Sequence, residues 1–177
     1  MNLYVVRHGE TIWNQERKVQ GITDIPLTEQ GIKSAEELIE LVNSLNIDVV
    51  ISSPLSRARD TAKILIDSKL PINTDDRIKE RDWGMNEGAI IDTVDTWDCW
   101  DVILNTKVQN IECIQDFMYR VSNFIEDIKV RYKDKNVLIV THSAVIRVIH
   151  YLLGTIPEDG NLSRINIPNL RIIEYKI

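Results

Sequence analysis

Three short apolar runs along the chain each end in a polar turn. They span 3–6, 49–52 and 137–140, and all three are rich in Val and Ile. Runs of this kind are typical of parallel strands that are buried on both faces. A fourth run, 170–177, indicates a closing strand that we expect to be antiparallel at an edge of the same sheet.

Helical periodicity fills the intervals between these runs. Apolar residues recur at helical spacing over 28–42, 56–66, 117–128 and 145–153; Thr28 is placed to cap the first of these segments, and Gly154 to stop the last. Strands that alternate with helices predict an α/β fold, a three-layer sandwich with a mainly parallel central sheet and helices on both faces. We find no repeat or linker and expect a single domain over 1–177.

The turns that follow the three apolar runs carry the candidate chemistry. Arg7-His8 follows the first run, the 53–57 loop follows the second, and His142 follows the third. In open parallel sheets, ligands bind beyond the carboxyl ends of the strands. We therefore expect these distant turns to converge on one crevice.

The residue types in these turns suit a phosphate group. A histidine is neutral for much of the time near pH 7, so the imidazole of His8 is able to attack phosphorus. Arg7 and Arg57 offer forked donors matched to phosphate oxygens, and Gly9 allows close backbone approach. Taken singly, each feature has a simpler explanation: His8 as a structural hydrogen-bonding residue and Arg57 as a solvent-facing side chain on a surface helix.

A proton donor is the remaining requirement for breaking an alkyl phosphate ester. Glu80 is able to hold that proton if burial or nearby negative charge raises its pKa. The alternative is that Glu80 and Glu87 are loop acids in surface ion pairs. His150 lies inside an apolar helical segment, and we interpret it as a packed or capping histidine.

Taken together, the ordered segments resemble the histidine phosphatase superfamily, in its phosphoglycerate-mutase-like branch. The resemblance extends from the N-terminus to about Gly154. It rests on Arg7-His8-Gly9-Glu10-Thr11 with Trp13-Asn14, on the 53–61 segment, on Glu80 with Gly84 and Glu87-Gly88, and on Thr141-His142.

The resemblance implies a role for each residue. His8 would accept the phosphoryl group, while Arg7, Arg57 and His142 would clamp it. Glu80 would protonate the leaving alcohol and then activate the attacking water. The substrate side would be formed by Asn14, Gly21, Ile22, Thr23 and Ser143. The resemblance implies no metal and no cofactor.

The segment after Glu80 bears on the choice between two reactions. Over 89–109 it holds one basic residue, Lys107, and four aspartates at positions 92, 95, 98 and 101. A mutase must retain an anionic bisphosphate, so we favour net hydrolysis of a small-molecule phosphate ester. The alternatives are a cofactor-dependent phosphoglycerate-mutase-type phosphotransferase and a non-catalytic binding module that retains the phosphate pocket.

The same stretch has two structural interpretations. Ile91, Val94, Trp97 and Leu104 would share one helical face, packed on the body of the domain with a solvated acidic edge. In the alternative, 85–110 forms a small cap over the pocket, with Trp97 or Trp100 facing the substrate. Such a cap would disfavour polyanions and tolerate a neutral or amine-bearing leaving group.

Bulk properties exclude little beyond this. The formal net charge of −6 argues weakly against nucleic-acid binding, and Cys99 and Cys113 are expected to be free thiols in a reducing cytosol. No basic leader or membrane-length apolar run is present in the sequence. We expect a cytoplasmic monomer or homodimer whose partner is a small phosphorylated metabolite, with no nucleic-acid or membrane partner.

Overall fold

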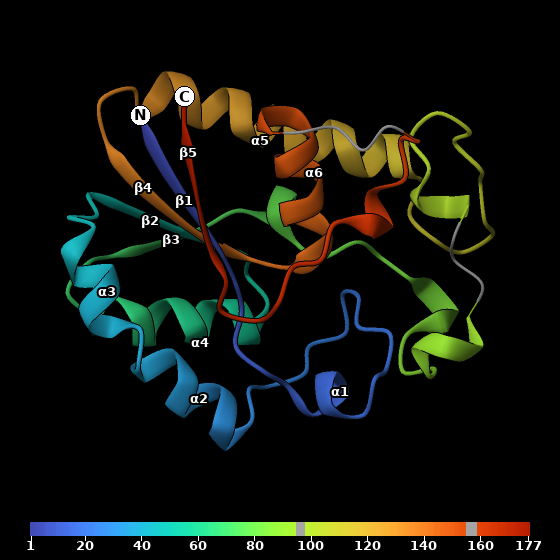
Figure 1. Ribbon diagram of the computed structural model, residues 1–177, viewed down its shortest axis with the longest axis horizontal. Coiled ribbons are helices and arrows are strands. Elements are labelled where there is room, and N and C mark those ends of the chain that lie inside the picture. Colours follow the sequence, from blue (N-terminus) through green and yellow to red (C-terminus); the bar gives the residue numbers. More distant parts are fainter. Residues whose placement is uncertain (95–97, 155–158) are drawn as a thin grey trace.

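A computed structural model describes residues 1–94, 98–154 and 159–177, and its described residues form one five-stranded sheet (Figure 1). Across the sheet the strands are β3 (Ile72–Thr74), β2 (Val49–Ser52), β4 (Asn136–Thr141), β1 (Asn2–Arg7) and β5 (Ile172–Lys176). The first four strands are parallel, and β5 pairs antiparallel with β1 at one edge. The mainly parallel sheet and its closing edge strand are confirmed, whereas β3 was not predicted because it has only three residues.

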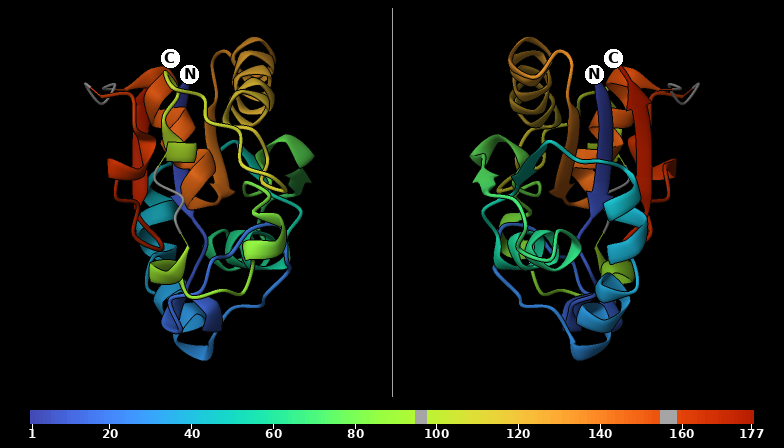
Figure 2. Two further views of the ribbon diagram at one scale, coloured as in Figure 1. Left: turned by 90° about the vertical axis from the view of Figure 1, so that its right-hand side faces the viewer. Right: turned by 90° about the vertical axis from the view of Figure 1, so that its left-hand side faces the viewer.

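Alternate residues of the central strands pack into two separate cores. Leu3 and Val5 of β1 face one core, and Tyr4 and Val6 face the other. A strand covered on both faces needs helices on both faces, as the three-layer prediction required. The second core also contains Ala62 of α4, so the helices of the two layers lie on opposite sides of the sheet (Figures 1 and 2).

Six α-helices occur in the described part of the chain. Their bounds are α1 Ile12–Gln15, α2 Glu29–Glu36, α3 Ile39–Ser44, α4 Ser56–Leu65, α5 Ile114–Arg131 and α6 Ser143–Leu153. Helices α5 and α6 pack on one face of the sheet, whereas α3 and α4 pack on the other (Figure 1). The helices expected over 56–66, 117–128 and 145–153 are confirmed.

The helix expected over 28–42 is divided into α2 and α3. Thr28 caps α2 as predicted, because its side chain accepts a hydrogen bond from the Gly31 N–H. The Leu38 N–H donates to the Ala35 carbonyl, three residues back, which tightens the turn and redirects the chain. Ile32 consequently stays partly exposed instead of joining the buried face.

The single helical face expected from Ile91 to Leu104 is wrong for the described residues. Short 3₁₀ turns occur at Ile91–Thr93 and Asp98–Trp100, and residues 95–97, including Trp97, lie outside the described part. The Asp101 carboxylate accepts hydrogen bonds from the N–H groups of Ile103 and Leu104, which favours a turn over a continuing helix. Leu104 is 66% exposed, so it packs on no core.

Cys99 is buried and Cys113 is half-buried, and neither forms a disulfide within the described residues, as expected. No helix in the described residues is long and apolar enough to cross a membrane.

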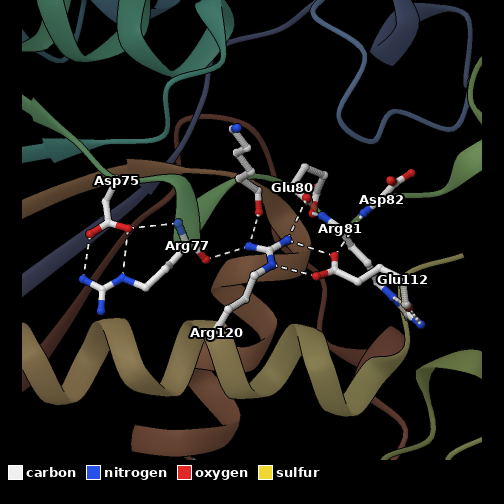
Figure 3. A network of polar contacts seen from close by, with 8 residues as sticks. Asp75, Arg77, Glu80, Arg81, Asp82, Glu112 and Arg120 are labelled. Atoms are coloured by element: carbon white, nitrogen blue, oxygen red, sulfur yellow. Dashed lines mark hydrogen bonds and ion pairs between the residues drawn. The ribbon is translucent and has the colours of Figure 1, made fainter.

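Arg120 of α5 fastens the loop that follows β3 to the body of the domain (Figure 3). Its guanidinium donates to the carbonyl oxygens of Arg77, Lys79 and Glu80 at 2.6, 2.8 and 3.0 Å. It also forms a forked pair with Glu112, with N–O distances of 2.7 and 2.9 Å. One side chain therefore fixes the backbone on which Glu80 is carried.

We expect Arg120→Met to lower the free energy of unfolding by about 2–4 kcal/mol, because it removes the cation paired with the Glu112 carboxylate and the donor to three carbonyls. Urea denaturation measures this change. Arg17→Met is the matched control, since Arg17 forms an exposed ion pair with Asp92 and such pairs contribute less than about 1 kcal/mol. Equal losses in the two variants would contradict the anchoring role of Arg120.

Candidate active site

The carboxyl ends of β1, β4 and β2 bring the predicted turns together. Arg7 lies opposite Thr141 in the parallel ladder. Beyond the strands the pairing continues, because the His8 N–H donates to the Thr141 carbonyl at 2.9 Å and the Ser53 N–H donates to the Val140 carbonyl at 3.0 Å. The three turns therefore lie side by side at one edge of the sheet.

His8 and His142 are neighbours in this crevice. Their ring centroids are 5.2 Å apart, the ring planes are inclined by 60°, and both side chains are buried. The Nδ1 atom of His8 lies 2.7 Å from the Gly9 carbonyl oxygen. A carbonyl only accepts, so Nδ1 donates and Nε2 holds the free lone pair when the ring is neutral.

The His142 ring is held through its Nε2, whereas the His8 ring is held through its Nδ1. Its Nε2 lies 2.7 Å from the hydroxyl oxygen of Ser53, which also accepts from the Leu55 N–H. Among the hydrogen bonds of the described residues, Nε2 is the one acceptor for the proton of the buried Ser53 hydroxyl, so the neutral His142 ring carries its own proton on Nδ1. That Nδ1 is buried and has no hydrogen-bond partner.

Two arginines, the half-buried Arg7 and the fully buried Arg57, act on the histidines. Arg7 donates one guanidinium nitrogen to the Ile167 carbonyl at 2.6 Å, and Arg57 donates two, to the carbonyls of Gly21 and Thr23 at 2.6 and 2.9 Å. The Nε atoms of both arginines are buried without a partner. Backbone carbonyls thus position the two cations but leave each with a free donor.

The electrostatics of the crevice keep both histidines neutral. Burial lowers the pKa of His8 well below its ordinary value, and the positive charges of Arg57 and Arg7 lower it further. Burial, followed by the charge on Arg57, also lowers the pKa of His142. Burial brings the pKa of Arg7 down to about 10, so this side chain is still a cation at neutral pH.

Glu80 is a buried carboxyl and not a surface loop acid. Burial raises its pKa, against the opposing effects of the Arg81 N–H and of the charge on Arg57. One carboxyl oxygen accepts from the Arg81 N–H at 2.8 Å, and the other lies 3.4 Å from the Ser143 hydroxyl and from the Ala144 N–H. The surface ion-pair interpretation of Glu80 is therefore wrong.

A cavity of about 270 Å³ opens on this group. Of the residues predicted for the site, five line it: Arg7, His8, Asn14, Glu80 and Ser143. Arg57 and His142 are fully buried and are not among the lining residues. The charge of Arg57 lowers the pKa of both histidines. Arg57 is therefore not the solvent-facing residue that its helix alone suggested.

The turn from Gly21 to Thr23 has a different place from the one expected. Its carbonyl groups hold Arg57, and the N–H groups of Ile22 and Thr23 donate to the Glu87 carboxylate at 2.9 and 2.8 Å. None of the three residues belongs to the cavity lining. The substrate site proposed below therefore omits them.

The cavity also contains residues that the sequence reasoning missed. Lys18, Gln20, Arg147, Asn166 and Ile167 line it. Arg147 lies one helical turn after Ser143, which was already assigned to the site, and it interrupts an apolar helical segment. The four-residue spacing from Ser143 was the sequence signal for Arg147, since residues four apart share a helix face.

The stretch over 89–109 contributes Ile91 and Trp100 to the cavity wall. Asp92, Asp98 and Asp101 are not part of that wall, and Asp92 instead pairs with Arg17 at 3.0 Å. These three aspartates therefore place no negative charge on the cavity wall, while Asp95 lies outside the described residues. Within the described part of the chain, no cluster of three or more His, Cys, Asp or Glu side chains is placed to hold a metal ion.

The lowered pKa values of the two histidines predict how stability depends on pH. Below about pH 6.5 the unfolded chain takes up protons that the folded site resists, so the folded state loses stability as pH falls, by up to about 1.4 kcal/mol per pH unit for each histidine. Glu80 contributes in the opposite direction: burial raises its pKa, so the folded protein binds this proton more readily than the unfolded chain and gains stability as pH falls. The contribution of one histidine is therefore isolated by comparing the wild type with a histidine variant.

We expect His142→Asn to lose roughly 1 kcal/mol less stability than the wild type between pH 7 and pH 5.5. Urea denaturation at several pH values measures the difference. Parallel stability curves over this range would show that His142 is not held neutral in the folded protein.

Comparisons with known proteins agree with this geometry. Residues 3–177 match the family described as the histidine phosphatase superfamily (branch 1). The chain is 36% identical to the "Uncharacterized phosphatase PhoE" of Bacillus subtilis (strain 168), over 97% of this chain and 89% of that protein. It is 43% identical to the "Probable phosphoglycerate mutase GpmB" of Yersinia pestis (strain Pestoides F), over 53% of this chain and 44% of that protein.

Among solved structures, Bacillus stearothermophilus YhfR superimposes with a TM-score of 0.86 at 30% identity. The superposition covers 99% of this chain and 91% of YhfR, so it includes the whole sheet and the crevice at its edge. The family match over nearly the full length and the likeness to PhoE agree with the resemblance on which the site was predicted. The chain belongs to the histidine phosphatase superfamily.

Proposed function

We propose that the protein is a phosphomonoesterase that hydrolyses a small-molecule phosphate ester through a phosphohistidine on His8. One observation carries this proposal. The Nε of Arg7, the Nε of Arg57 and the Nδ1 of His142 are buried and have no hydrogen-bond partner. The charges of both arginines act on the neutral imidazole of His8, and the His142 ring centroid lies 5.2 Å from that of His8. A phosphoryl group brings oxygens that satisfy such donors and a phosphorus atom for the imidazole to attack.

In the first step, the lone pair on His8 Nε2 attacks phosphorus. A P–N bond forms, and the bond between phosphorus and the ester oxygen breaks. The leaving oxygen takes the proton of the Glu80 carboxyl, whose protonated form is favoured by burial. The alcohol is released, and Glu80 is left as a carboxylate.

In the second step, the Glu80 carboxylate takes a proton from water as the water oxygen attacks phosphorus. The P–N bond breaks, inorganic phosphate leaves, and His8 returns to its neutral form with its lone pair on Nε2. Glu80 regains the proton that it gave up, so the cycle balances. The carboxyl lies against the start of α6, which also carries Ser143 on the cavity wall.

Fixed positive charge supplies the remaining stabilisation in this proposal. Phosphoryl transfer requires mainly positioning and electrostatic stabilisation of the equatorial oxygens. Arg7 and Arg57 are already oriented by backbone carbonyls, so little reorganisation is needed as the reaction proceeds. The proposal uses no metal ion, and it takes the substrate to be a small phosphorylated metabolite of the cytoplasm.

A phosphoglycerate-mutase-type phosphotransferase is the second candidate, favoured by the likeness of half the chain to GpmB. A mutase holds the phosphorylated product until it is phosphorylated again. Lys107, the one basic residue over 89–109, is exposed and does not line the cavity. Isomerisation of phosphoglycerates faster than phosphate release would favour the mutase.

His8→Ala is the first test of the proposed chemistry. We expect it to reduce hydrolysis of an aryl phosphate by at least about 1,000-fold, because no other group is placed to accept the phosphoryl group. Released phosphate measures the loss. His150→Gln is the matched control, since His150 contacts the Tyr175 hydroxyl at 3.0 Å and lies outside the cavity lining.

Equal activity of His8→Ala and the wild type would overturn the phosphohistidine mechanism. The assay is run with and without a chelator, and we expect the same rates under both conditions. Loss of activity with chelator, restored by a divalent metal, would contradict the metal-free part of the proposal.

Glu80→Gln separates proton donation from phosphate binding. We expect kcat/KM, which reports transfer to His8, to fall by about 100-fold for an alkyl phosphate and by less than about tenfold for an aryl phosphate. The aryl leaving group needs little protonation, so it acts as the internal control. Matching losses on both esters would remove Glu80 from the role of acid.

A further inference from the structure

The loop over 165–170 lies against the end of β1, next to the nucleophile of the proposed reaction. The Leu170 N–H donates to the Arg7 carbonyl at 3.0 Å, and the Ile167 carbonyl accepts from the Arg7 guanidinium at 2.6 Å. Leu170 has a φ of 60°, in the left-handed region that residues other than glycine seldom adopt. Contacts with the rest of the fold therefore hold this loop in an unfavourable shape, and such strain is common beside active sites.

Asn169 extends from this loop to the backbone that follows β1. Its Nδ2 lies 2.8 Å from the His8 carbonyl oxygen and 3.2 Å from both the Gly9 carbonyl oxygen and the Oδ1 of Asn14. Carbonyl oxygens only accept, and the Asn14 Oδ1 already accepts from the Thr11 N–H, so it is the nitrogen of the Asn169 amide that faces all three oxygens. The Asn169 side chain is therefore a donor at this place.

The Gly9 carbonyl is the acceptor that sets the tautomer of His8. The His8 Nδ1 lies 2.7 Å from it, so Nδ1 keeps the proton and Nε2 keeps the lone pair for the attack on phosphorus. Gly9 has no Cβ atom, and its backbone is consequently less restricted than that of other residues. An acceptor on a glycine needs support from other segments if it is to hold an imidazole in one orientation.

Two side chains from distant elements hold the backbone around Gly9. Thr61 of α4 accepts from the Gly9 N–H at 2.9 Å, and Asn169 donates to the carbonyl oxygens of His8 and Gly9. These contacts restrain both the peptide group before Gly9 and the peptide group after it. Asn169 is half-buried and lies outside the cavity lining, so its effect on the reaction passes through the residues that it holds.

We propose that Asn169 is a positioning residue for the nucleophile: its amide holds the Gly9 carbonyl, which in turn holds His8 with the Nε2 lone pair toward phosphorus. The inference rests on the proposed function and adds a residue that lies beyond the motifs from which the site was predicted. The same amide donates to Asn14, a residue of the cavity lining, so Asn169 orients two groups of the site.

Asn169→Ala and Asn169→Asp test the proposal kinetically. The first variant removes the donor, and the second keeps the size of the side chain but places a carboxylate against three acceptor oxygens. We expect kcat/KM for an aryl phosphate to fall by about 10- to 100-fold in both, comparable to the loss when a metal-binding histidine is deprived of its outer hydrogen-bond partner. Either variant alone is sufficient, and wild-type kcat/KM in a folded Asn169→Ala or Asn169→Asp protein would overturn the proposal.

Asn136→Ala is the matched control. The Asn136 amide also donates to two backbone carbonyls, those of Leu45 and Asn46 at 3.1 and 3.0 Å, but it lies at the end of β4 opposite to the crevice. We expect Asn136→Ala to lower the midpoint of urea denaturation about as much as Asn169→Ala and to keep kcat/KM within about twofold of the wild type. Equal losses of activity in the two variants would overturn the proposal, because lost stability would then explain the effect of Asn169.

The tautomer of His8 gives a readout that a purely structural role of Asn169 would not change. Nitrogen NMR of isotope-labelled protein at neutral pH distinguishes the protonated ring nitrogen from the one with the lone pair, and His8→Ala assigns the signals. We expect Nδ1 to be the protonated atom in the wild type and in Asn136→Ala, and both tautomers to be present in Asn169→Ala. The single wild-type form in a folded Asn169→Ala protein would contradict the positioning role.

The NMR readout is independent of turnover, so it separates this inference from the proposed function. A tautomer that depends on Asn169, in a protein that hydrolyses no phosphate ester, would support the positioning role and contradict the proposed function. Hydrolysis through His8 that is as fast in Asn169→Ala as in the wild type would overturn the positioning role and leave the proposed function intact.

Discussion

The structure depends on a set of buried donors that the protein itself leaves unsatisfied. The side chains of Arg7, Arg57 and His142 each bury a nitrogen without a partner at the end of the central strands. Such a group costs about 1–3 kcal/mol relative to one that is hydrogen-bonded. In the proposed reaction the oxygens of the phosphoryl group supply the missing acceptors and offset this cost. Carbonyl oxygens of other segments orient the two arginines, and the Ser53 hydroxyl orients His142, so these donors are in place before the anion arrives.

The remainder of the scaffold can be understood as support for that arrangement. The carbonyls that hold Arg57 belong to a turn that Glu87 in turn holds by its N–H groups. The loop that carries Glu80 is fastened by Arg120, whose guanidinium donates to three of its carbonyls (Figure 3). Arg120 thus spends its donors on the loop that carries Glu80 and on Glu112, whereas Arg7 and Arg57 each keep an Nε without a partner. The division explains why the helix α5, which contributes nothing to the cavity lining, matters for the acid.

How much of this could be predicted from the sequence depends on whether the signal was local. Strand ends are local, so the short Val-rich runs placed His8 and His142 in one crevice, and the ordered motifs brought in Arg57 and Glu80. The break between α2 and α3 was missed because a single three-residue turn at Leu38 does not disturb the apolar spacing. Arg147 was missed because a lone basic residue in an apolar helix belongs to no motif. Its place on the cavity wall depends on the fold, which brings Trp100 from a distant part of the chain against it. The stretch over 89–109 misled for a related reason, since its aspartates make turns and surface pairs that periodicity does not distinguish from a helical edge.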